Sequence, residues 1–121
     1  MKVPLDCGSI AAVAEGPITL NTKMLMEGSY PRLYQSGVRY RRQLDPHRWA
    51  TVDEVLAAGY ADCKNLVCWR AAELRMVGVS ARMFAYPTGD GIWHAVIRLP
   101  GGQVEDPSVK LGMRRAAGYR R

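Results

Sequence analysis

The chain has 121 residues, a formal net charge of +6, three cysteines and two histidines. This length predicts one domain, residues 1–121, with a core large enough to need no disulfide or metal support. No stretch approaches the roughly 20 apolar residues of a membrane span, so we expect no membrane partner. The three cysteines cannot all form disulfides with one another, which favours reduced thiols in a cytoplasm. They also lack the spacing of zinc ligands, so we expect neither a metal nor a cofactor.

The first 30 residues are the hardest to assign. Glycines and prolines punctuate them throughout, which predicts no long regular elements there: Pro4, Gly8, Gly16, Pro17, Gly28 and Pro31. The stretch ITLNTKMLM fits a strand as well as a short helix. Residues 31–49, PRLYQSGVRYRRQLDPHRW, are expected to run extended with a loop around Asp45–Pro46.

The middle and C-terminal parts carry clear patterns. Thr51 and Glu54 match a capping box, which predicts a short helix stopped by Gly59. Asp62 opens a longer helix, whose apolar residues recur every three or four positions. SARMFAY and IWHAVIRL alternate as strands around the turn PTGDG, and QVEDP follows the turn PGG. This order predicts an α+β fold in which the longer helix packs on a small antiparallel sheet.

Cys63 falls in the first turn of the longer helix, directly after Asp62. Unpaired backbone N–H groups and the helix dipole favour negative charge there, which predicts a lowered pKa for the Cys63 thiol. The same N–H groups can stabilise the oxyanion of a tetrahedral intermediate. The charge of Asp62 acts in the opposite direction. A small buried core residue is the alternative interpretation of a cysteine at this position.

His94 lies in the middle of a predicted strand, where a histidine is commonly a hydrogen-bonded core residue. If PGG forms a three-residue hairpin loop, Leu99 faces Gln103 and Val96 faces Asp106. Asp106 and His94 are then diagonal neighbours on one face, within about 7–8 Å between Cα atoms. A carboxylate at that distance can orient the imidazole and stabilise its charged form.

Three blocks of sequence resemble the core of transglutaminase-like cysteine enzymes: GYADCKNLVCWRAAELRMVGVSARM, WHAVI and VEDPS, over about residues 59–108. The resemblance implies a papain-like arrangement, with a cysteine at a helix start and histidine and aspartate on adjacent strands. It implies that Cys63 is the nucleophile, His94 the general base and then acid, and Asp106 its orienting partner. The recognisable core would span about residues 51–110, leaving the two ends poorly assigned.

The chain departs from that family in one respect and leaves another open. Family members often carry acidic residues after the nucleophile, where this chain has Lys64 and Asn65. Both side chains are expected to point outward, so the difference bears on substrate charge. A papain-like site also takes an oxyanion donor from an upstream residue, and no motif fixes it here. The candidates for the oxyanion donor or the substrate pocket are Gln35, Tyr34, Trp49 and Trp93, for which surface or core roles are the alternative.

The predicted activity is acyl transfer from an amide or peptide bond through a thioester, with a protein or peptide as substrate. Hydrolysis, as in a peptidase, amidase or deamidase, is favoured over crosslinking because so short a chain has little room for an amine-binding site. The alternative is a non-catalytic structural or assembly protein on the same fold.

Two weaker features bear on partners and location. PRLYQSGVRYRRQ with Trp49 resembles short phage-encoded members of the family. This implies a protein of the host cytoplasm or the virion, with phage structural proteins as partners. Arginines cluster at residues 39–42 and 114–121, which is compatible with nucleic acid or an acidic partner. No nucleic-acid motif accompanies them.

Overall fold

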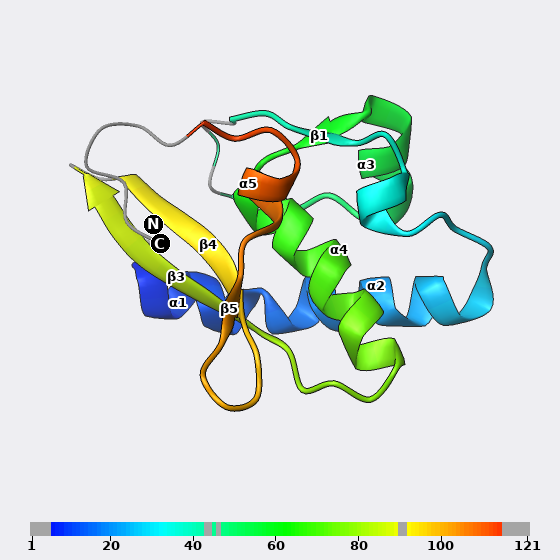
Figure 1. Cartoon of the computed structure of the whole chain (residues 1–121), viewed down its shortest axis with the longest axis horizontal. Helices are drawn as coiled ribbons and strands as arrows, with labels where there is room; N and C mark the ends of the chain where they lie inside the picture. The colour runs from blue at the N-terminus through cyan, green and yellow to red at the C-terminus, as the bar shows by residue number, and fades with distance from the viewer. Residues whose placement is uncertain (1–5, 43–44, 46, 90–91, 115–121) are drawn as a thin grey trace.

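The computed structural model describes residues 6–42, 45, 47–89 and 92–114, which form an α+β fold (Figure 1). A three-stranded antiparallel sheet has the order β3-β4-β5, and α4 lies between α2 and β4. The predicted fold class is therefore confirmed at this level. The elements are α1 (Cys7–Val13), α2 (Glu15–Glu27), η1 (Leu33–Gln35), β1 (Arg39–Tyr40), α3 (Val52–Ala58), β2 (Tyr60–Ala61), α4 (Cys63–Met76), β3 (Arg82–Gly89), β4 (Ile92–Arg98), β5 (Val104–Glu105) and α5 (Pro107–Lys110).

The N-terminal part differs from the prediction, because α1 and α2 are regular helices. Pro17 lies in the first turn of α2, where its missing N–H leaves no helical bond unmade, and Gly28 follows the last residue. These residues therefore mark helix ends and do not prevent helices, and ITLNTKMLM is helical. Buried side chains recur at helical spacing through both segments: Ile10, Ala14, Ile18, Asn21 and Leu25.

The antiparallel sheet has the register that the PGG loop predicts. Ile97 lies opposite Glu105 on β5. The Leu99 N–H donates to the Gln103 carbonyl at 2.8 Å. Asp106 follows β5 directly, so this register brings it diagonally opposite His94. The Asp90–Gly91 part of the predicted PTGDG turn lies outside the described residues.

A separate pair of short parallel strands, β1 and β2, was not predicted. Tyr40 on β1 lies opposite Ala61, and its N–H donates to the Leu111 carbonyl at 2.9 Å. The segment predicted to be extended, residues 31–49, thus contains η1 and β1 as short elements. Within the predicted loop the His47 N–H donates to the Asp45 carboxylate at 2.9 Å, and Pro46 lies outside the described residues. β1 therefore links the chain entering α4 to the chain leaving α5.

The helix boundaries follow the predicted chemistry. The Thr51 hydroxyl accepts the Glu54 N–H, and the Glu54 carboxylate accepts the Thr51 N–H at 2.9 Å, which completes the capping box. Gly59 ends α3 in the left-handed region with φ 81°. α4 begins at Cys63 with Asp62 as its N-cap. None of the helices within the described residues is both long enough and apolar enough to cross a membrane.

We expect Gly59→Ala to lower the free energy of unfolding by about 1 kcal/mol, because a Cβ disfavours the left-handed conformation. Crowding plays no part, since a Cβ at Gly59 would meet no atom within 4 Å. Gly16 in α2 is the matched control, because its surroundings are equally open and its φ is ordinary. Gly16→Ala should raise the free energy of unfolding by up to about 0.5 kcal/mol. Urea unfolding measures both, and the same sign for the two variants would contradict this account.

Candidate active site

The N-terminus of α4 presents Cys63 to β4. Asp62 caps the helix by accepting the Asn65 N–H at 3.1 Å, which fixes the first turn. Cys63 is partly exposed, whereas Cys68 is wholly buried. The Cys63 sulfur accepts hydrogen bonds from the backbone N–H groups of Ala95 and Lys64. The thiol therefore lies against the strand residue that follows His94.

The junction of β5 and α5 holds the histidine. His94 is buried in β4, and its Nε2 lies 2.9 Å from Oδ2 of Asp106. The other carboxylate oxygen of Asp106 accepts the Val109 N–H at 3.3 Å and so caps α5. Tyr86 on β3 meets the imidazole edge-on, with 5.7 Å between ring centroids. One carboxylate thus both orients the imidazole and starts a helix.

The environment of Cys63 contradicts the predicted lowering of its pKa. Burial raises the pKa of the Cys63 thiol to about 12. The N–H group of Ala95 acts to lower it, the charge of Asp62 raises it further, and that of Lys64 lowers it. The helix N-terminus does favour the thiolate, but desolvation outweighs it because the sulfur is packed against β4. The resting thiol is therefore protonated at neutral pH.

The prediction that Lys64 and Asn65 point outward is wrong. Their exposed fractions are only 1% and 2%. The Lys64 ammonium binds the Asp62 carboxylate at 2.5 Å and donates to the Asp45 carbonyl at 3.2 Å. The Asn65 side chain accepts the Ala50 N–H at 2.9 Å. Both side chains hold the preceding loop onto α4, so they build the site and do not face a substrate.

The four residues predicted for the oxyanion donor or the pocket are placed differently from one another. Gln35 is exposed on η1. The Tyr34 hydroxyl donates to Glu105 on β5. The Lys64 ammonium lies over the Trp49 ring, 5.5 Å from the ring centroid. Trp93 lies opposite Pro87 in the sheet and packs against the core.

Tyr40 is a site residue that the sequence interpretation missed. Burial raises the pKa of its phenol, and Cys63, Asp62 and Asp106 raise it further when they are ionised, while the charge of Arg42 opposes them. Its hydroxyl is therefore protonated at neutral pH and lies within the electrostatic range of Cys63 and Asp106. No local signal marks Tyr40, because its position depends on the pairing of β1 with β2, whose paired residues are 21 positions apart in the chain.

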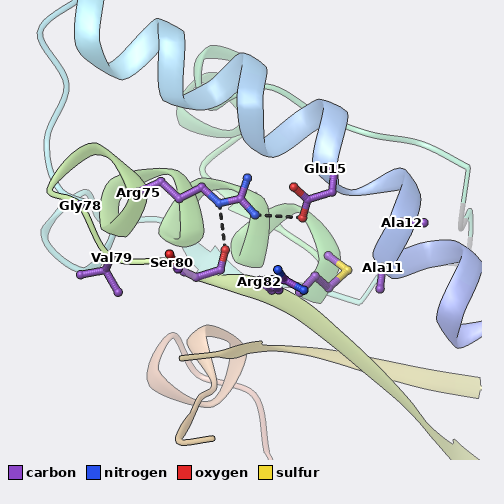
Figure 2. Close-up of a pocket in the computed structure, with 10 residues that line it drawn as sticks. Ala11, Ala12, Glu15, Arg75, Gly78, Val79, Ser80 and Arg82 are labelled. Atoms are coloured by element: carbon purple, nitrogen blue, oxygen red, sulfur yellow. Dashed lines mark hydrogen bonds and ion pairs between the residues drawn. The ribbon is translucent and has the colours of Figure 1, made fainter. Parts of the chain in front are cut away.

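A cleft of about 750 Å³ lies away from Cys63, between α1 and the chain entering β3 (Figure 2). Arg75 and Glu15 form an ion pair at its wall, at 2.9 Å, and the Arg75 Nε donates to the Ala81 carbonyl at 2.9 Å. None of its lining residues belongs to the Cys63 site. Within the described residues, no group of three or more His, Cys, Asp or Glu side chains could hold a metal ion.

Comparisons with known proteins identify no relative of this chain. No family model matches the chain, and searches of curated proteins and of solved structures find no significant match. The functional argument therefore rests on the chemistry of the residues that meet at the start of α4.

Proposed function

We propose that this chain is a cysteine-dependent acyl-transfer enzyme of transglutaminase-like type, which attacks an amide or peptide bond through a thioester intermediate. The observation that supports the proposal most is the 2.9 Å contact between His94 Nε2 and the Asp106 carboxylate. His94 lies on β4, and the N–H of the next residue, Ala95, donates to the Cys63 sulfur. A thiol at a helix start and a carboxylate-oriented imidazole on the adjoining strand are the groups that a cysteine nucleophile requires.

The first half of the proposed reaction forms the thioester. In the proposed step Nδ1 of His94, the ring nitrogen that does not contact Asp106, takes the thiol proton as the sulfur attacks the carbonyl carbon. The carbonyl oxygen becomes an oxyanion, for which the Cys63 N–H at the start of α4 and the Tyr40 hydroxyl are the proposed donors. His94 then passes its proton to the leaving nitrogen, and the carbon–nitrogen bond breaks.

The second half releases the acyl group. His94 removes a proton from water, which attacks the thioester and displaces the Cys63 thiolate; the thiolate recovers the proton from the imidazole. Asp106 orients the ring and stabilises its charged form in both halves. Water is the proposed acceptor, so the overall reaction is hydrolysis.

Trapping the acyl-enzyme tests this proposal. Incubation with p-nitrophenyl acetate should acetylate the native protein once, at Cys63, as located by intact mass and peptide mapping. Added water-soluble primary amine should not speed release if water is the acceptor. Acetylation of Cys7 at the same rate as Cys63, or none at Cys63, would contradict the proposal and favour the non-catalytic alternative.

The raised pKa of Cys63 gives a separate prediction for the resting protein. Only a thiolate is alkylated, so the rate of Cys63 alkylation by iodoacetamide should rise about tenfold per pH unit between pH 7 and 10. It should level off only near the pKa of about 12. Mass spectrometry of the peptide that contains Cys63 measures the rate. A plateau near pH 8 would mean that the resting thiol is already ionised.

A further inference from the structure

A mostly buried network of charged side chains lies behind the candidate site. Arg70 on α4 donates from Nε to Glu105 Oε2 at 2.7 Å and from Nη1 to Glu73 Oε1 at 3.1 Å. The side chains of Arg70, Glu105 and Glu73 are 20%, 14% and 9% exposed. The Tyr34 hydroxyl donates to the same oxygen of Glu105. Four residues from η1, α4 and β5 thus meet at one point.

Each member of this network is held from more than one side. Glu73 Oε2 also accepts the Leu33 N–H at 2.8 Å and the Trp69 indole N–H at 3.2 Å. Burial acts to raise the pKa of the Glu105 carboxyl, but hydrogen bonds from Arg70 and Tyr34 hold it below its ordinary value. Glu105 is therefore ionised and fixed to α4 in the folded protein.

The position of the network relates it to Asp106. β5 is only two residues long, so few ladder bonds fix the strand end from which Asp106 projects. Glu105 is the residue before Asp106, and Arg70 lies about two turns after Cys63 on the same helix. The Arg70–Glu105 contact therefore ties the Asp106 backbone to the helix that carries the thiol.

We infer that Arg70, Glu105 and Tyr34 form a clamp that positions Asp106, and through it His94, relative to Cys63. Its catalytic consequence rests on the proposed function, but the geometric part does not. A purely stabilising role is a weaker account, because a buried ion pair often contributes no more stability than apolar side chains of the same volume. Positioning matters more, since a misplacement of about 1 Å can cost a hundredfold in rate.

The test compares two arginines of the same helix. Arg70→Met breaks the clamp, and Arg75→Met removes the same charge from the Glu15 ion pair at the distant cleft (Figure 2). Tyr34→Phe weakens the clamp without changing charge. One readout is the exchange of the His94 Nε2–H with water, followed by ¹⁵N NMR, because an ionised Asp106 accepts that hydrogen. The other is kcat and KM for p-nitrophenyl acetate.

In Arg70→Met we expect the Nε2–H to exchange at least about tenfold faster, and kcat to fall on the order of ten- to a hundredfold with KM within about twofold. Tyr34→Phe should shift both in the same direction by at least about threefold, and Arg75→Met should leave both unchanged. If Arg70→Met does not fold, Tyr34→Phe and Arg70→Lys decide. The inference would be overturned if folded variants of Arg70 and Tyr34 exchanged the Nε2–H at the wild-type rate and kept the wild-type kcat. Because the exchange rate needs no activity, it tests the clamp even if the acyl-enzyme proposal fails.

Discussion

Cys63→Ala is expected to abolish thioester formation, with a loss of at least about 10⁴-fold in the rate of p-nitrophenyl acetate turnover. Cys68, on the same helix, cannot act as the nucleophile, because its side chain is wholly buried. Alanine also keeps the helix start intact, because the N-cap is Asp62. The loss should therefore come without unfolding. Stopped-flow detection of p-nitrophenolate, with circular dichroism of the same sample, measures both quantities.

The matched control is Cys7→Ala, which removes a partly exposed thiol from the start of α1. It should retain wild-type turnover. Full turnover in Cys63→Ala would end the enzyme interpretation, whereas loss in both variants would point to a general effect of thiol removal on the fold.

Asp106→Asn is expected to lower the rate of thioester formation by about 10²- to 10⁴-fold while leaving stability nearly unchanged. The amide cannot stabilise the imidazolium and can bind the wrong tautomer of His94. It can still cap α5, because asparagine and aspartate are equally good N-cap residues. The substitution therefore separates the two roles that the structure gives to this carboxylate.

Asp106→Ala completes the comparison. It should lose the same activity and, in addition, about 1 kcal/mol of unfolding free energy, because the Val109 N–H loses its acceptor. Turnover and urea unfolding of the three proteins measure both. If Asp106→Asn turned over at the wild-type rate while Asp106→Ala was destabilised, Asp106 would be a helix cap alone.

Local chemistry explains which parts of the fold were predictable. The Thr51 capping box, the left-handed Gly59 and the N-cap Asp62 depend on residues within three or four positions of each other. The register of β4 and β5 follows equally from the short PGG loop. These features place Cys63 at a helix start and bring His94 and Asp106 together. The same reasoning failed for α1 and α2, where residues that usually interrupt structure lie at helix ends.

The sequence by itself determined the α+β order, the helix start at Cys63 and the hairpin that joins His94 to Asp106, because each depends on short stretches of chain. Tertiary packing decided the environment of the thiol. Burial against β4 raises the pKa of the Cys63 thiol, where the sequence predicted a lowered pKa. The loop before α4 buries the side chains of Lys64 and Asn65. Pairing of distant strands brings Tyr40 to the site. Desolvation and strand pairing depend on residues remote in the chain, so no local pattern could have revealed them.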